Sequence, residues 1–381
     1  MPQHIDKSQL AFFSAFCLFL STLEFLIPKP LPFLRIGLAN LPLLVSLKSQ
    51  PPRFTVALCL LKIAGQAVVG GSLFSYIFLF SAAGSLASVA VMLGCGRLFG
   101  EKMTLAGIGV LGSLASNVTQ IFLARSFFLG EGAVLIAPPF LLIGCATGLF
   151  LGLFAQAALE KSQWIRVLPP RPEYGRAEGR QPREARRAYF IFLCGLVSVF
   201  PFIYTGPLAA KAVLSVLYMA LARFSGRKIR ILPNAVLLLT VTALHCLRPF
   251  GKVIFMLGSW PLTEGALETG LLRSLTLIGL VYLSRLTVRP QLRFPGRAGG
   301  IFSAMLCDFE RITGCGLRIR RKDFWADLDR LFAAVYESGA PPVQTAAAVC
   351  TGSGAGSVFS RYAPWALFAL ANWAVYVAAR F

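Results

Sequence analysis

Two groups of polar residues recur at helical spacing inside apolar segments of this sequence. Lys62 and Gln66 lie four residues apart, so one face of a helix would carry both side chains. Ser113, Asn117 and Gln120 recur in the same way and form a polar stripe. Such a stripe either joins neighbouring helices through hydrogen bonds or lines a binding site, and the pattern alone leaves both interpretations open.

A further set of polar residues interrupts the apolar stretch LEFLIPKPLPFLRIGLANLPLL, residues 23–44. Its first three prolines cannot continue a helix, so we expect the chain to break there and re-enter as a short helix. Non-helical backbone at membrane depth is tolerated only where protein covers it or where it lines a watery cavity. Because a carboxylate facing lipid is costly, Glu24 either faces an internal pocket or pairs with Arg35 or Lys62, and the two roles are compatible.

These residues together predict a pocket for a small solute that is anionic or that combines polar and apolar parts. The predicted substrate-binding residues are Glu24, Arg35, Asn40, Lys62, Gln66, Asn117 and Gln120. We find no H-E-x-x-H, no paired-aspartate motif for a magnesium diphosphate and no C-x-x-C pair. The sequence therefore predicts no catalytic centre, no metal site and no cofactor.

The composition indicates what kind of element carries these residues. Of the 381 residues, 56% are hydrophobic and 14% are charged, and the mean hydropathy is +0.70. A soluble domain carries about 25% charged residues, whereas a membrane-spanning helix needs roughly 20 apolar residues in succession. We therefore predict an all-α, polytopic helical membrane protein in a lipid bilayer. The net charge of +21 fits basic residues gathered on the cytoplasmic side better than it fits nucleic-acid binding, which we do not expect.

The chain divides into two apolar parts around a basic Pro/Gly-rich linker at residues 160–187. The first part, residues 1–159, is predicted to be a six-helix substrate-binding membrane domain. Its apolar segments are residues 10–27, 36–47, 54–69, 73–93, 105–123 and 134–159. Lys and Arg are in excess at the connections that would lie on the same side of the membrane as the N-terminus and the linker. We therefore expect the N-terminus and the linker to be cytoplasmic, and the protein to be in the inner membrane of the cell.

The second part, residues 188–381, is predicted to be another helical membrane domain. Its expected spans are residues 189–204, 208–221, 231–246, 271–286 and 363–378, with an outer loop around residues 248–268. Residues 289–340 alternate basic and apolar side chains and predict amphipathic cytoplasmic helices. The residues predicted to form a coupling surface there are Arg297, Arg318, Arg320 and Arg321.

The stretch LEFLIPKPLPFLRIGLANLPLL, followed by SLFSYIFLFSAAGSLAS, closely resembles the signature of the Gx transporter family. That family is also labelled heptaprenyl diphosphate synthase component I. The resemblance covers roughly residues 10–159. It implies a relationship to the substrate-binding S components of energy-coupling-factor transporters, which have six helices and a ligand pocket near the outer face.

GALETGLLRSLTLIGLVYLSRLT, residues 265–287, resembles the transmembrane coupling (T) subunit of the same transporters. This resemblance implies separate ATPase subunits that act in trans. In that family, Ala-Arg-Ser or Ala-Arg-Gly motifs dock on the ATPases. This chain has GRAGG around Arg297 and RIRRKDF around Arg320 in their place.

The leading interpretation is a transporter component that binds and imports a small solute, anionic or related to vitamins or isoprenoids. An enzymatic alternative is a membrane component of polyprenyl diphosphate synthesis. Chain elongation needs carboxylates that hold Mg²⁺, and the first domain offers only Glu24 within its apolar segments. A third alternative is a membrane partner for flavin- or quinone-linked electron transfer.

Overall fold

The computed structural model describes most of the chain, and the protein is almost entirely helical. The described residues are 6–26, 37–167, 182–226, 229, 231–247, 250–257, 260–288, 296–314, 324–337 and 358–379. Within these ranges, six helices are long and apolar enough to cross a membrane. The predicted all-α, multi-pass membrane class is therefore confirmed, while the orientation of the N-terminus stays a prediction.

The first helical bundle follows the six predicted apolar segments. Its helices are α1 (Lys7–Leu26), α2 (Leu41–Ser49), α3 (Pro52–Val69), α4 (Tyr76–Phe99), α5 (Leu105–Ala124) and α6 (Ala133–Lys161). Proline stands in the first turn of α2 and of α3, where its missing N–H has no helical partner to lose. A 3₁₀ turn (Leu38–Asn40) leads into α2 from Gly37, whose φ of 84° is in the left-handed region that glycine tolerates.

Glycines bring α5 and α6 into direct backbone contact. Gly144, Gly148 and Gly152 are spaced by four and share one face of α6. A Cβ atom on Gly148 would lie 2.6 Å from the carbonyl oxygen of Gly109, and one on Gly152 would lie 2.5 Å from the Cα atom of Ala106. Membrane helices associate through such small-residue faces, because lipid supplies no hydrophobic drive between them.

A second bundle is built from five helices of the C-terminal half. They are α8 (Pro182–Tyr204), α9 (Leu208–Phe224), α10 (Ile231–Cys246), α11 (Glu264–Thr287) and α14 (Val358–Ala378). Phe202, Tyr218 and Leu283 are fully buried in its core. The Tyr218 hydroxyl donates to Asn372 Oδ1, which ties α9 to α14.

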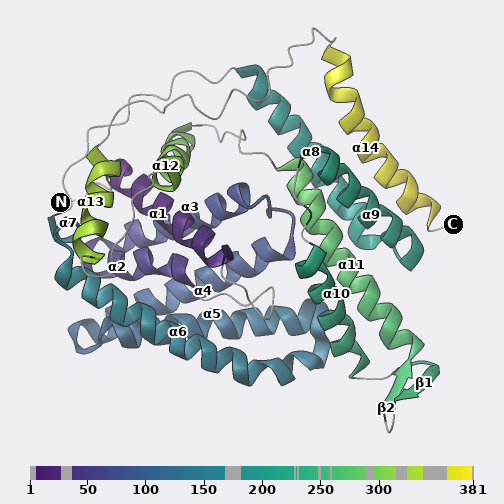
Figure 1. Ribbon diagram of the computed structural model, residues 1–381, viewed down its shortest axis with the longest axis horizontal. Helices are drawn as coiled ribbons and strands as arrows, with labels where there is room; N and C mark the ends of the chain where they lie inside the picture. Colours follow the sequence, from purple (N-terminus) through teal and green to yellow (C-terminus); the bar gives the residue numbers. More distant parts are fainter. Residues whose placement is uncertain are drawn as a thin grey trace.

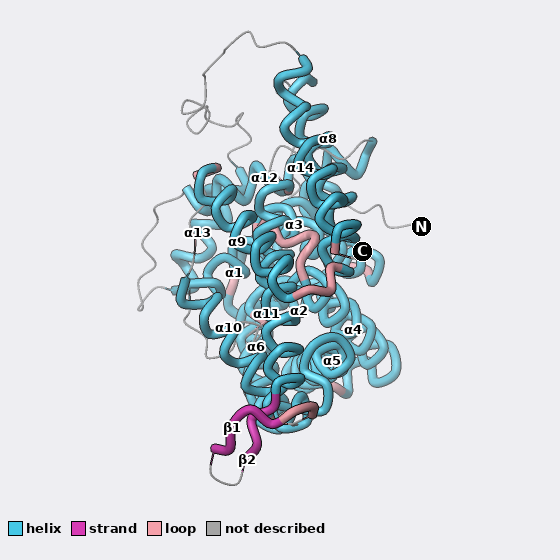
Figure 2. Tube along the Cα trace, turned by 90° about the vertical axis from the view of Figure 1, so that its right-hand side faces the viewer, coloured by secondary structure: helices cyan, strands magenta, loops and turns pink. Residues whose placement is uncertain are grey.

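The prediction of a loop around residues 248–268 is wrong in part, because this segment contains two strands and the first turn of α11. Two antiparallel strands, β1 (Val253–Leu257) and β2 (Trp260–Thr263), form a hairpin there, and α11 begins at Glu264 rather than at residue 271. The hairpin projects from one end of the molecule (Figure 2). Apolar side chains such as Ile254 and Phe255 are exposed on it.

Two helices from the C-terminal half pack against the first bundle instead of the second. α12 (Gly296–Gly314) lies along α1, and α13 (Phe324–Glu337) lies beside the short helix α7 (Gln163–Val167), as Figure 1 shows. Met305 of α12 and Phe332 of α13 belong to the core of the first bundle. The two hydrophobic cores therefore do not follow the division of the chain at residues 160–187.

The two bundles meet where the turn after α3 reaches α11. The backbone N–H of Phe74 donates to Ser284 Oγ at 3.1 Å. Gly71 has a φ of 57°, and a Cβ atom on it would lie 3.3 Å from the Cα atom of Arg285. The turn approaches α11 closely because glycine occupies this position.

Candidate functional site

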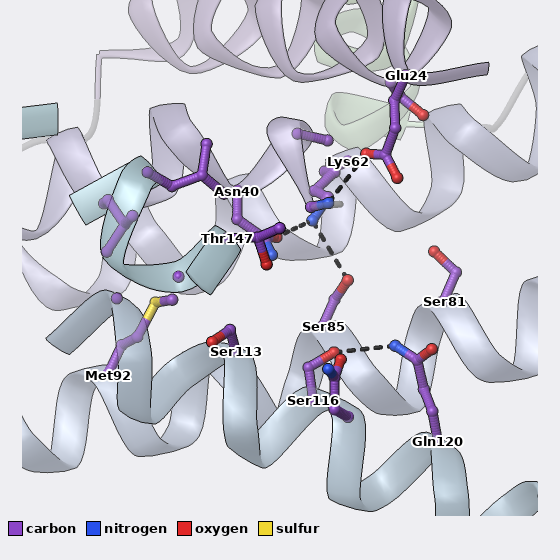
Figure 3. Close-up of a pocket in the computed structure, with 18 of the residues that line it drawn as sticks. Glu24, Asn40, Lys62, Ser81, Ser85, Met92, Ser113, Ser116, Gln120 and Thr147 are labelled. Atoms are coloured by element: carbon purple, nitrogen blue, oxygen red, sulfur yellow. Dashed lines mark hydrogen bonds between the residues drawn. The ribbon is translucent and has the colours of Figure 1, made fainter. Parts of the chain in front are cut away.

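A cavity inside the first bundle brings together most of the predicted binding residues. It offers about 70 Å³ to the centres of water-sized molecules and is lined by residues of α1 to α6 and of the 3₁₀ turn. The predicted residues that line it are Glu24, Asn40, Lys62, Gln66, Asn117 and Gln120. Arg35, the seventh, lies outside the described residues. Figure 3 shows the side chains of Glu24, Asn40, Lys62 and Gln120 converging on the cavity from separate elements.

Lys62 is the cation of this cavity, and its side chain is only 3% exposed. Its ammonium group donates to Asn40 Oδ1 on the 3₁₀ turn and to Ser85 Oγ on α4, the latter at 3.3 Å (Figure 3). A buried charge is stable only where such partners replace water. Lys62 therefore holds the entry into α2 against α3 and α4, while its charge stays at the cavity wall.

Glu24 is the carboxylate of this cavity, near the end of α1, and is 6% exposed. Its Oε2 atom accepts hydrogen bonds from the backbone N–H groups of Gly37 and Leu38, at 3.2 and 3.1 Å. These N–H groups start the 3₁₀ turn and have no partner within it. Glu24 thus fixes the segment that re-enters the bundle after the proline-rich stretch.

The polar stripe of α5 serves both roles that its spacing left open: one residue joins neighbouring helices, and another lines the cavity. Asn117 Nδ2 donates to the carbonyl oxygen of Phe140 at 2.9 Å and so joins α5 to α6. Gln120 Nε2 donates to Ser116 Oγ at 3.0 Å. The Oε1 atom of Gln120 is buried and has no partner within the described residues. Of the stripe, Gln120 thus keeps one polar atom that no described residue satisfies, although it lines the cavity.

Hydroxyl groups complete the polar wall, and sequence reasoning missed most of them. The hydroxyl residues that line the cavity are Ser21, Ser81, Ser85, Ser113, Ser116 and Thr147. Ser81 Oγ donates to Gln66 Oε1 at 3.0 Å and joins α4 to α3. The signal that would have found the pair on α4 is the four-residue spacing of Ser81 and Ser85, which places both on one helix face.

The arrangement can bind a small polar molecule. One carboxylate, one ammonium, several amides and a set of hydroxyls face a partly apolar space. Within the described residues, no three His, Cys, Asp or Glu side chains gather as a metal ion would require.

The predicted coupling residues are not placed by the structure. Arg297 belongs to α12, but its side chain is not described, and Arg318, Arg320 and Arg321 lie outside the described residues. Their role stays a prediction.

Comparison with known proteins finds family models that match two parts of the chain. Residues 13–158 match the family model of heptaprenyl diphosphate synthase component I. This match covers nearly all of α1 to α6, including every described wall of the cavity, and confirms the predicted resemblance of the first bundle. Residues 187–290 match the model of a domain of unknown function (DUF8519). No curated protein and no solved structure matches the chain. The resemblance of residues 265–287 to a coupling subunit thus gains no support and stays a prediction.

Proposed function

We propose that the first bundle captures a small polar solute in its cavity, and that the whole chain is a membrane component of an importer for this solute. The observation that carries the proposal is the cavity itself: Lys62, Glu24 and Gln120 are buried together inside a membrane bundle, around free space. Polar and ionisable residues inside a membrane are expensive, and they commonly mark substrate or ion pathways.

Two features favour binding over a purely structural polar core. The cavity has space for several waters or a small organic molecule, since one water needs about 10–15 Å³ of volume measured in this way. Gln120, which lines the cavity, also has a buried acceptor, Oε1, without a hydrogen-bond partner among the residues that the structure describes. A polar network that served only to join helices would satisfy its members internally.

The chemistry of the wall defines the class of solute. An anionic group of the solute would pair with Lys62, and neutral donors and acceptors would meet the amides and hydroxyls. Leu44, Ile77 and Met92 supply apolar surface for the rest of the molecule. These groups suit a small anion or zwitterion with a short apolar part. The import direction and the separate ATPase subunits are parts of the proposal that rest on the resemblance.

The test is to identify the small molecules that co-purify with the full-length chain. The protein is purified in mild detergent and denatured, and the released compounds are measured by mass spectrometry. We expect one compound to be retained by the wild type and reduced at least tenfold in Lys62→Ala, because losing a buried charged partner costs roughly 2 kcal/mol or more of binding. Lys48→Ala is the matched control, since Lys48 is exposed at the end of α2.

Each outcome has a defined meaning. Equal retention by a folded Lys62→Ala variant, or no enriched compound at all, would contradict the proposal. An isoprenoid among the released compounds would identify the cargo class without assigning synthesis to this chain. The same preparation, searched for co-purifying ATPase subunits, addresses the source of energy.

A further inference from the structure

A second, smaller chamber of about 50 Å³ adjoins the cavity at the junction of the two bundles. The two chambers share Ser21, Gln66, Ile77 and Ser81 as a common wall. The far side of the second chamber is formed by Ser72, in the turn after α3, and by Arg285 of α11. The second bundle therefore contributes a charged residue, Arg285, to a chamber that shares a wall with the predicted site.

Arg285 is held at this chamber by its surroundings. Its guanidinium carbon lies 5.6 Å from the ring centroid of Tyr282, one turn earlier on α11, within the range of a cation–π contact. A Cβ atom on Gly71 would lie 3.4 Å from Arg285 Cγ, so the turn after α3 packs directly on the arginine stem. Arg285 itself is half-buried.

The charges of the two chambers differ. The first chamber holds Lys62 together with Glu24, whose charges are opposite. The lining of the second chamber includes Arg285 and no acidic residue among the described side chains. The positive charge of Arg285 in the lining of the second chamber favours an anionic group there.

One hydrogen bond between side chains, from Ser81 Oγ to Gln66 Oε1, crosses the shared wall at 3.0 Å. Both residues line both chambers, so this hydrogen bond lies between them. A solute that replaced this hydrogen bond with its own polar groups would connect the chambers.

We infer that the two chambers form one extended site, and that Arg285 is a specificity-determining residue for the anionic end of an elongated solute. This inference rests on the proposed function, because it extends the same site. On this assignment the bound solute contacts both bundles, so occupancy of the site depends on where α11 lies.

The charge of the second chamber is measured with two thiol reagents of opposite charge. Full-length Ser72→Cys protein is labelled in detergent with the anionic sulfonatoethyl methanethiosulfonate or with the cationic trimethylammonium-ethyl methanethiosulfonate. Mass spectrometry of the peptide that contains position 72 gives the two labelling rates without interference from the native cysteines. We expect the anion to react faster, and Arg285→Gln to lower the anion-to-cation rate ratio roughly fivefold or more.

Matched variants separate the charge of Arg285 from its packing. Arg285→Lys keeps the charge and should keep most of the ratio. Arg273→Gln removes a charge from the same helix, beside Phe127 and away from the chamber, and should leave the ratio unchanged. Gly71→Ala, which would push against Arg285 without removing its charge, provides a second perturbation if Arg285→Gln does not fold; it should lower the ratio by a smaller factor.

The outcomes distinguish this inference from the proposed function. An unchanged ratio in a folded Arg285→Gln variant, or no labelling of position 72 by either reagent, would overturn the extended site. Ser85→Cys in the first chamber is labelled in the same way. If its anion-to-cation ratio changes in Lys62→Gln while the ratio at position 72 does not change in Arg285→Gln, the proposed function stands and the inference is refuted.

Discussion

At the scale of single residues, Glu24 shows how one side chain serves both the fold and the site. A carboxylate in this apolar segment predicted a pocket or an ion pair. The structure adds a partner of another kind, the backbone N–H groups of Gly37 and Leu38. Because these groups begin the 3₁₀ turn that carries Asn40, Glu24 also sets the position of a cavity residue.

We predict that Glu24→Gln lowers the stability of the protein as well as solute retention. A glutamine keeps the shape of the side chain but accepts the two N–H bonds without a full charge, and charge-assisted hydrogen bonds are roughly twice as strong as neutral ones. We expect a loss of about 1–2 kcal/mol of unfolding free energy, visible as a lower Tm in detergent. Glu160→Gln is the control, because Glu160 is exposed near the end of α6. Equal melting of both variants would show that Glu24 has no anchoring role.

Residue types and spacing predicted acids, bases and amides that gather at the cavity, and apart from Ser113 they missed most of its hydroxyls. Glu24 and Lys62 stand out because charge is rare in apolar helices. Serine is common in such helices and usually bonds to its own backbone, as Ser14 does with Leu10. Only the three-dimensional arrangement separates Ser85, which receives the Lys62 ammonium, from Ser14.

At the scale of elements, the contact between α5 and α6 depends on glycine. We predict that Gly152→Ala destabilises the protein by about 1–3 kcal/mol, because the new methyl group would overlap the α5 backbone at Ala106. Gly96→Ala, in α4, should be neutral or stabilise by up to about 1 kcal/mol, since nothing lies within 4 Å of its new methyl group and alanine favours helix. Thermal unfolding of both variants in the same detergent measures the difference. Similar Tm values would refute the tight contact.

The hydropathy pattern predicted the helices of the first bundle well, and it predicted the connection before α11 poorly. The apolar segments that predicted α1 to α6 are long, and their ends carry proline, glycine or charge. The segment before α11 lacks such a clear signal. Its strand β1 is short, and the first turns of α11, EGALETG, are polar enough to be assigned to a loop. Pairing with β2 decides the hairpin, and pairing is not visible in a local pattern.

At the scale of the whole molecule, aromatic packing attaches α13 to the first bundle. The ring of Phe332 lies 4.8 Å from that of Phe16, 5.8 Å from that of Phe12 and 5.0 Å from that of Trp164. We predict that Phe332→Ala releases α13, since removing a buried phenylalanine costs about 3–5 kcal/mol. Faster hydrogen–deuterium exchange in residues 324–337, measured by mass spectrometry, would report the release.

The control for this prediction is Arg330→Ala on the same helix. The Arg330 side chain is 75% exposed and pairs with Asp327 three residues away, an interaction worth about 0.3–0.5 kcal/mol. Exchange in this variant should match the wild type. If Phe332→Ala also matches the wild type, α13 is not held by its aromatic contacts.

The sequence predicted that α12 and α13 are amphipathic, and it did not predict what they cover. An apolar face shows that a helix is half-buried, but the face is equally suited to a membrane surface, a partner protein or a distant part of the same chain. Here Met305 lies against Gly65 of α3, where the missing side chain leaves room for it. This contact joins two positions far apart in the chain, so a local sequence pattern cannot predict it.

The path of the chain between the two cores has a practical consequence for the expression of fragments of this protein. After α7 the polypeptide leaves the first core, builds α8 to α11, returns with α12 and α13, and leaves again for α14. A fragment that ends with α6 would lack three aromatic partners of Phe12, namely Trp164, Phe332 and Tyr336, and would expose an apolar surface. Reassembly from pieces would need a separate break at each crossing, with all the pieces co-expressed.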